Sequence, residues 1–380
     1  MNMKAEPIRV LHITEMLSAA GIESFFMNVY RKIDRSKVQF DFLVLRDEHE
    51  FYEDEVNSLG GHKYWIHSNK GNTLLRIIEE SKMIRQFLQS HPYDIVHIHY
   101  TTPLRAPYLK EIKEAGVSTR IYHAHSAFVS GKNIIKHMVY GYMRKNITKY
   151  ATDYFACSKA AGEWIFEKKL LSDGIVKVIY NGLEIDRFTF DQQRRSDIRN
   201  ELKIENKFVL VHTGRFTEQK NQMFLVNVFS ELHKRDKETF LLFLGDGPLK
   251  PNVEARVKEL KIADSVLFLG VKNNVQDYLF AADCYVMPSL YEGLPVAGVE
   301  AQCAGLPCVF SENITREVGL LKETTFLSLE QSVDKWCEEI YKFKGHRNNL
   351  AHNEIREAGY DMADVANRLQ AFYIERAKKK

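Results

Sequence analysis

The stretch LYEGLPVAGVEAQCAGLPCVF (residues 290–310) places two carboxylates, Glu292 and Glu300, in a run that is otherwise uncharged. It follows the hydrophobic run DCYVMPS, which predicts a buried strand, and its first proline, Pro295, suits the first turn of a helix. The stretch therefore predicts a strand, a turn containing Glu292, and a helix containing Glu300. Carboxylates so placed can accept hydrogen bonds from the paired hydroxyls of a ribose or hexose. The alternative is that Glu292 is a helix-start carboxylate and Glu300 is a solvated helix residue.

The same alternation of strands and helices runs through the rest of the chain. Strand-like runs begin near residues 8, 38, 62, 94, 119, 153 and 176, and the series restarts near residue 207. Such alternation is typical of doubly wound sheets with parallel strands. At 380 residues the chain is long enough for two of them. We expect an α/β fold of two doubly wound Rossmann-like lobes that face a central cleft.

The restart of the pattern sets the expected domain boundaries. Residues 1–182 and 183–358 are the two Rossmann-like domains, and residues 359–380 are a C-terminal helix that packs back toward the first lobe. The polar and charged stretch 181–206 is the expected join between the domains.

The composition excludes several classes of protein. With 45% hydrophobic and 27% charged residues, the chain is neither disordered nor of low complexity. A net charge of +3 without a basic-aromatic signature argues against nucleic-acid binding. No signal peptide precedes the first strand, no apolar run is long enough to span a membrane, and the five cysteines form no CxxC pair. We expect a cytoplasmic protein.

Candidate ligand-binding residues follow the predicted strands of the second lobe. Arg215 and Lys220, in HTGRFTEQKNQ, could clamp a diphosphate; the alternative is a solvated basic loop. Other candidates share the end of a strand or the start of a helix, where backbone can approach a nucleotide or an anion. They are Gly245 and Gly247 in FLGDGP, Val271 in FLGVKNN, and Gly293 and Leu294 after Glu292. The alternative for each is an ordinary tight turn.

The first lobe offers weaker candidates. Gly21, in SAAGIES, opens a predicted helix and could let a phosphate approach the backbone. His123 and His125 lie at the end of a predicted strand. They could contact a sugar, bind a metal ion or be ordinary hydrogen-bonded histidines, and we favour the last for whichever ring points inward. The segment 131–150 carries five Lys or Arg and no acid, which suggests contact with anionic lipid or simply a cationic surface helix.

YEGLPVAGVE resembles the E-x7-E signature of the retaining GT-B glycosyltransferases of family 4. GRFTEQKN, GDGP, FLGV, IYNGLEIDRF and the closing helix also follow that family's order, so the resemblance spans nearly the whole chain. It implies transfer of a sugar from a nucleotide diphosphate sugar, with UDP as the expected nucleotide. The acceptor would be a glycan or a polyprenyl-linked sugar in the synthesis of a bacterial capsule or exopolysaccharide, at the inner face of the plasma membrane.

The resemblance also implies residue roles. The first domain lies on the acceptor side and the second binds the nucleotide sugar. Glu292 would contact the donor sugar, Glu300 the ribose, Arg215 and Lys220 the diphosphate, His125 the transferred sugar, and Gly21 phosphate or acceptor. Of these, the expected catalytic residues are His125, Arg215, Lys220 and Glu292, and the other candidates bind the donor. The family often has a double glycine in the first loop, whereas this chain has Ala19 and Ala20 before Gly21.

No Asp-x-Asp pair occurs in the sequence, so we expect transfer without a metal or other cofactor. Two other functions remain open at this point. A non-hydrolysing nucleotide-sugar epimerase would share the fold, and a non-catalytic nucleotide-sugar-binding protein would share the donor site. A nicotinamide oxidoreductase would need a fuller GxGxxG pattern after its first strand than this chain has.

Overall fold

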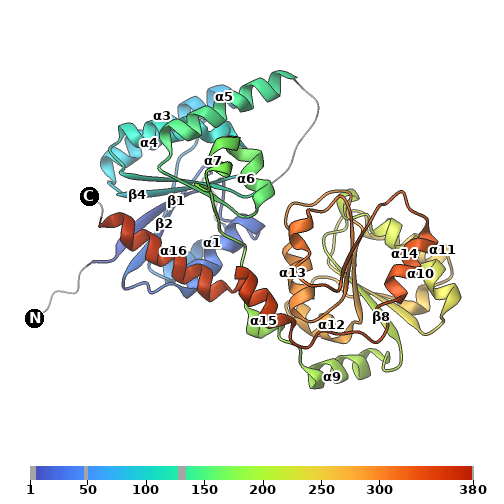
Figure 1. Ribbon diagram of the computed structural model, residues 1–380. Coiled ribbons are helices and arrows are strands. Elements are labelled where there is room, and N and C mark those ends of the chain that lie inside the picture. Colours follow the sequence, from blue (N-terminus) through green and yellow to red (C-terminus); the bar gives the residue numbers. More distant parts are fainter. Residues whose placement is uncertain (1–5, 47–49, 127–133, 379–380) are drawn as a thin grey trace, which may run out of the picture. The chain divides into compact units, whose positions relative to one another are not determined.

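The computed structural model describes residues 6–46, 50–126 and 134–378. The chain divides into two compact units. The first comprises Met1–Gly182 together with Met362–Lys380, and the second comprises Leu183–Asp361 (Figure 1). Each unit is built around one parallel sheet with helices, as the strand and helix alternation predicts.

The first unit contains a seven-stranded sheet in the order β3-β2-β1-β4-β5-β6-β7. Its strands are β1 (Ile8–Ile13), β2 (Val38–Val44), β3 (Lys63–Trp65), β4 (Ile95–Tyr100), β5 (Thr119–Ala124), β6 (Asp153–Ala156) and β7 (Lys177–Val178). Its helices are α1 (Gly21–Lys32), α2 (Glu53–Ser58), α3 (Thr73–Ser90), α4 (Ala106–Glu114), α5 (Ile134–Tyr150), α6 (Lys159–Ile165), α7 (Lys168–Ser172) and α16 (Met362–Ala377).

The second unit contains a six-stranded sheet in the order β10-β9-β8-β11-β12-β13. Its strands are β8 (Phe208–Thr213), β9 (Thr239–Leu244), β10 (Val266–Phe268), β11 (Cys284–Met287), β12 (Cys308–Ser311) and β13 (Thr324–Leu327). Its helices are α8 (Ile185–Phe188), α9 (Gln192–Leu202), α10 (Gln222–Arg235), α11 (Lys250–Glu259), α12 (Val275–Ala281), α13 (Val296–Cys303), α14 (Val333–Tyr341) and α15 (Ala351–Ile355).

Apolar side chains cover both faces of the first sheet. Ile84 of α3 and Leu109 of α4 belong to one buried cluster, and Phe26 of α1 and Leu369 of α16 belong to another. Strands covered on both faces read as near-continuous hydrophobic runs, which is why IRVLHIT and DIVHIHY could be recognised in the sequence.

The C-terminal helix α16 packs against α1 of the first unit, which confirms that the end of the chain returns to the first lobe (Figure 1). Val365, Leu369 and Tyr373 form its buried face. Residues at this spacing share one side of a helix, so a single stripe of side chains attaches α16 to the sheet of the first unit.

The charged stretch 181–206 is not a simple connecting segment, because much of it forms α9 of the second unit. Arg195 donates to the carbonyl of Ala282 at 2.7 Å, and Arg199 donates to that of Ala281 at 2.7 Å. Arginine side chains commonly hydrogen-bond the last carbonyls of a helix, here those at the end of α12. The charge pattern therefore reflects helix-end contacts within one unit.

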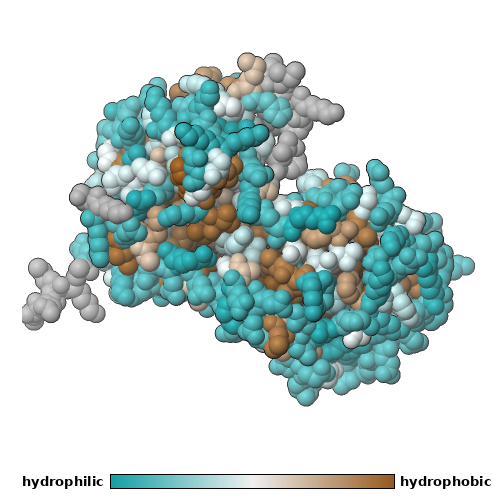
Figure 2. Space-filling view, in the orientation of Figure 1, coloured by the Kyte–Doolittle hydropathy of each residue, from teal (hydrophilic) through white to brown (hydrophobic). Residues whose placement is uncertain are grey.

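Hydrophilic side chains cover most of the surface drawn in Figure 2. Among the residues that the structure describes, no helix is long and apolar enough to cross a membrane.

Candidate functional site

The loops that follow β8 and β9 in the second unit pack directly on each other. A Cβ at Gly245 would lie 2.1 Å from the carbonyl oxygen of Gly214, and the backbone of Gly245 has a φ of +130°. At Gly247 a Cβ would lie 2.6 Å from the backbone of Phe216. At both of these glycines, which the sequence also singled out, the absence of a side chain lets the backbones of the two loops touch. This contact sets the shape of this edge of the sheet.

Two of the predicted donor-binding residues form an ion pair with each other. Lys220 Nζ lies 2.6 Å from Glu292 Oε1, and the two side chains are only 17% and 11% exposed. The loops that carry them are tied together, since the Leu290 N–H donates to the Gln219 carbonyl at 2.8 Å. The structure thus places opposite charges in a fixed and mostly buried position at the carboxyl ends of β8 and β11.

Arg215 and Val271 are both exposed, Val271 at 77%. Arg215 makes no ion pair with any residue in the described ranges, so its guanidinium is available to an anion. The apolar side chain of Val271 follows β10, where a flat base could lie against it.

The helix after β11 begins slightly later than the sequence suggests. Pro295 is the N-cap of α13, with φ −73° and ψ 109°, so the first helical residue is Val296. Gly293 and Leu294 lie in a bend before this cap, and their amides are outside the helix start. Proline suits the N-cap because it has no N–H group, and an N–H group at the start of a helix has no partner within the helix.

Glu300 lies within α13 and is partly buried among apolar neighbours. Burial raises the pKa of its carboxyl from 4.5 to about 7, and the positive charge of Arg187 partly opposes the shift. Its side chain makes no hydrogen bond to the described part of the chain. A carboxylate with unused acceptor positions suits a ligand that offers two hydroxyl groups.

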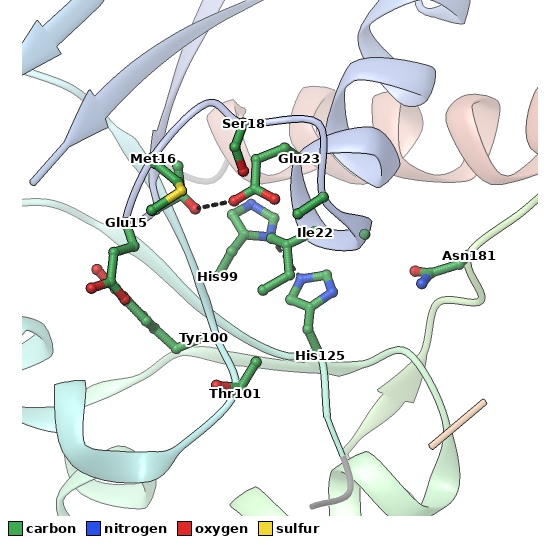
Figure 3. Close-up of a pocket in the computed structure, with 13 residues that line it drawn as sticks. Glu15, Met16, Ser18, Ile22, Glu23, His99, Tyr100, Thr101, His125 and Asn181 are labelled. Carbon is green, nitrogen blue, oxygen red and sulfur yellow. Dashed lines mark hydrogen bonds between the residues drawn. The ribbon is translucent and has the colours of Figure 1, made fainter. Parts of the chain in front are cut away.

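The first unit has a pocket of about 340 Å³ at the carboxyl ends of β1 and β4 (Figure 3). His125 lines it, whereas His123 is fully buried beneath, so His125 is the histidine available to a ligand. Gly21 also lines the pocket and opens α1. No described atom lies within 4 Å of where a Cβ would stand at Gly21, so sterics do not require glycine there.

Sequence reasoning missed much of this pocket. Glu23 is 5% exposed, and burial raises the pKa of its carboxyl. Further buried histidines, His12, His97 and His99, lie on β1 and β4. The signal was present, because His97 and His99 alternate within DIVHIHY and must face the same side of the sheet.

Two family descriptions match the chain. Residues 19–187 match the model described as Glycosyltransferase Family 4, and residues 193–360 match that described as Glycosyl transferases group 1. A putative glycosyltransferase of Bacillus subtilis, EpsF, is 32% identical to this chain over 94% of each protein. The chain belongs to glycosyltransferase family 4. It is therefore an enzyme that uses a nucleotide-sugar donor.

Two other relatives match over nearly their full length. One is a UDP-Gal:alpha-D-GlcNAc-diphosphoundecaprenol alpha-1,3-galactosyltransferase of Escherichia coli, 23% identical over 99% of each chain. The other is the capsular polysaccharide biosynthesis glycosyltransferase CapH of Staphylococcus aureus, 24% identical over 97% of this chain and 99% of CapH. The relatives of this chain thus include enzymes of bacterial polysaccharide synthesis.

The crystal structure of Anabaena HepE in complex with UDP is similar in fold, with a TM-score of 0.74 and 16% identity over 96% of this chain and 99% of HepE. The likeness confirms the GT-B fold expected from the sequence.

We predict that the affinity for a nucleoside diphosphate rises with pH through about 7, because the ionised Glu300 carboxylate accepts on both oxygens and more strongly than the protonated carboxyl does. Calorimetric titration between about pH 6 and pH 8 measures this. In Glu300→Gln the affinity should be weaker at the upper end by at least about 10-fold, from the loss of a charge-assisted hydrogen bond of about 1.5–3 kcal/mol. The pH dependence of the affinity that remains in Glu300→Gln is the part that comes from the ligand's own titration.

The same carboxyl affects the stability of the ligand-free protein in the opposite sense. The folded chain holds the Glu300 proton more tightly than the unfolded chain does, so this group's contribution falls as pH rises from 4.5 to about 7. Equal pH profiles of wild type and Glu300→Gln, in both binding and stability, would contradict the prediction.

Proposed function

We propose that the enzyme moves a sugar, with retention at the anomeric carbon, from a UDP-sugar to a glycan or lipid-linked acceptor during assembly of a bacterial capsule or exopolysaccharide. The observation that carries the proposal is the mostly buried Lys220–Glu292 ion pair at the carboxyl ends of β8 and β11. Arg215 belongs to the loop after β8, and Glu300 belongs to the helix that follows β11. The uridine nucleotide and the undecaprenol-linked acceptor named for the Escherichia coli relative, and the capsular polysaccharide named for CapH, support the substrate classes.

In this proposal the donor exchanges partners with the Lys220–Glu292 ion pair. The diphosphate takes Lys220, together with the free guanidinium of Arg215, and the released Glu292 carboxylate accepts hydroxyls of the sugar. Each charge-assisted hydrogen bond contributes about 1.5–3 kcal/mol, so the new contacts can offset the loss of one ion pair. Glu300 holds the ribose, the loops at Gly245 and Gly247 shape the diphosphate site, and Val271 lies against the base.

The amides near the turn add to the same anion site. Gly293 and Leu294 precede α13, so their N–H groups are outside the helical hydrogen bonds and can donate to a phosphate or sugar oxygen. These N–H groups stabilise the ligand's charge without reorganisation, because the backbone fixes their direction before the ligand arrives.

The leaving diphosphate needs charge stabilisation more than it needs a proton. Arg215 and Lys220 supply positive charge at the phosphate, so we infer that departure does not require a metal ion. The departing phosphate oxygen takes the proton from the acceptor hydroxyl on the same face of the sugar. The acceptor oxygen then bonds to the anomeric carbon as the carbon–phosphate oxygen bond breaks, through an oxocarbenium-like state.

We place the acceptor in the pocket of the first unit, where His125 would lie beside the transferred sugar and where Gly21 is also a lining residue. Burial lowers the pKa of His125 to about 3, so the ring is neutral and acts as a hydrogen-bond partner. Glu23 and Glu15 offer carboxyl oxygens to acceptor hydroxyls in the same pocket (Figure 3).

We also propose that segment 131–150 contacts an anionic membrane surface, where a lipid-linked acceptor would lie. Residues 131–133 are outside the described residues, and the remainder forms α5. On α5, Met138 is 71% exposed and Tyr142 is 65% exposed. Lys145 and Lys149 lie one turn apart on the same helix. Exposed apolar side chains beside cations are typical of helices that lie in a membrane interface.

The central experiment supplies purified enzyme with UDP-sugars and an undecaprenol- or short-chain lipid-linked acceptor and identifies the product by NMR. We expect the donor's anomeric configuration in the product. Arg215→Ala should reduce kcat/KM by about 10- to 100-fold, because it loses an interaction of about 1.5–3 kcal/mol with the leaving group. Lys322→Ala, a cation that is 86% exposed in the same unit, should leave kcat/KM within about twofold.

An inverted product would contradict the retaining mechanism. Interconversion of donor sugars without an acceptor would favour an epimerase, and donor binding without turnover would favour a non-catalytic protein. The rate of transfer should be the same with a chelator and with added magnesium; a strict need for magnesium would overturn metal-free departure.

For the membrane contact we predict that the enzyme co-sediments with vesicles rich in phosphatidylglycerol at low salt and is released by salt. Each basic residue near such a surface contributes roughly 1 kcal/mol, so Lys145→Glu with Lys149→Glu should weaken binding by more than about 10-fold. Lys234→Glu with Lys322→Glu, which makes the same charge change in the second unit, is the control. Equal loss in both double variants would show a non-specific charge effect, and no sedimentation would remove the proposal.

A further inference from the structure

Five histidines form one buried layer inside the first unit. His12 is on β1, His97 and His99 are on β4, His123 is on β5, and His125 follows β5 directly. The register pairs His12 with His97 and His99 with His123, so their rings lie side by side across three adjacent strands. Centroids of neighbouring rings are 4.1 to 5.5 Å apart.

His99 is the middle member of a chain of three rings. Its Nε2 lies 2.9 Å from Nδ1 of His12, and its Nδ1 lies 2.9 Å from Nε2 of His125. His12 and His99 are each 1% exposed, so water does not compete for these contacts. The chain runs from the buried sheet to the pocket, where both His99 and His125 are lining residues (Figure 3).

The number of protons shared among these three histidine rings is fixed. Burial lowers the pKa of His12 and of His125 to about 3 and that of His99 well below its usual range, so all three rings are neutral. A neutral imidazole carries one N–H and one bare nitrogen. His99 therefore donates to one neighbour and accepts from the other, and the chain has two possible arrangements. All three rings carry the proton on Nδ1, or all three carry it on Nε2.

The remaining nitrogen at the pocket end is unused. Nδ1 of His125 is buried and has no hydrogen-bond partner among the described residues. A buried polar atom without a partner costs about 1–3 kcal/mol, so a ligand group at this position would be favoured. In one arrangement this nitrogen donates a hydrogen bond, and in the other it accepts one.

The nitrogens of His99, His123 and His125 are also close enough to suggest a metal site, since they lie within 4.8 Å of one another. The distances favour hydrogen bonds. Two nitrogen ligands of a tetrahedral zinc ion, each about 2.0–2.1 Å from the metal, are about 3.3 Å apart. The 2.9 Å between His99 and His125 is shorter and is typical of a shared proton.

We propose that His99, supported by His12, is a positioning residue that fixes the ring plane and the tautomer of His125. His125, which lines the pocket, then presents the transferred sugar with a neutral ring of fixed orientation, whose Nδ1 has one defined role, donor or acceptor, toward a hydroxyl that reaches it. The place of the sugar rests on the proposed function, whereas the hydrogen-bonded chain stands on the geometry alone. Removing the residues that orient metal ligands commonly changes activity by about 10- to 100-fold, and we expect an effect of similar size for a residue that orients His125.

The test is NMR of the full chain with 15N-labelled histidine, in which ring shifts distinguish a protonated nitrogen from a bare one. His125 is assigned by the signal lost in His125→Gln. In the wild type bound to a UDP-sugar, we expect His12, His99 and His125 to share one tautomer. In His99→Phe, which keeps the ring volume and removes both nitrogens, His125 should show a mixture of its two neutral tautomers.

Kinetics gives the second readout. His99→Phe should lower kcat by at least about 10-fold while donor KM changes by less than about threefold, because nucleotide contacts lie in the other unit. His99→Gln, whose amide can hydrogen-bond both neighbours, should recover part of kcat.

The matched control is the double variant His97→Phe with Tyr373→Phe. It removes both partners of a 2.7 Å hydrogen bond in the same buried layer. The hydrogen bonds that join His12, His99 and His125 stay intact. It should change stability as much as His99→Phe but should keep the His125 tautomer and kcat.

Unlike tautomers among the three rings, or an unchanged His125 tautomer in His99→Phe, would overturn the inference whether or not the enzyme transfers sugar. Stoichiometric transition metal in the purified protein, lost in His99→Phe, would also overturn it, because ligation replaces the shared protons. If the tautomers behave as expected and no transfer is found with any donor, the proposed function fails and the histidine chain stands.

Discussion

Every strand pairing in the described part of both sheets is parallel, and the rest of the structure depends on this constraint. Parallel strands bring all their carboxyl ends to one edge, so the loops that follow them meet there. In the second unit this edge brings together Lys220, from the loop after β8, and Glu292, from the loop after β11. In the first unit it gathers the pocket around His125.

The buried polar groups at the two sheet edges are compensated in different ways. In the second unit, opposite charges compensate each other, since Lys220 and Glu292 pair at 2.6 Å. In the first unit the polar groups are neutral imidazoles, and each proton is shared between rings.

Much of this could be predicted from the sequence. The strands were recognisable because they are buried on both faces, and Glu292 and Glu300 stood out as charges in an apolar run. Local pattern did not reveal contacts between distant segments. Gly245 was noticed as a possible nucleotide contact, but its steric need comes from Gly214, on another loop. The charged stretch 181–206 suggested a join between domains, but Arg195 and Arg199 within it bind carbonyls at the end of α12. The histidine layer needs the register of three strands, which no single segment contains.

The most direct test of the central claim is a crystal structure of the chain with a bound UDP-sugar. The account predicts ribose hydroxyls on the Glu300 carboxylate and the diphosphate on Arg215 and Lys220. It also predicts an open Lys220–Glu292 pair, with Glu292 turned to the sugar. A nucleotide bound elsewhere, or bound here with the 2.6 Å ion pair intact and Glu300 without contact to the ribose, would contradict it.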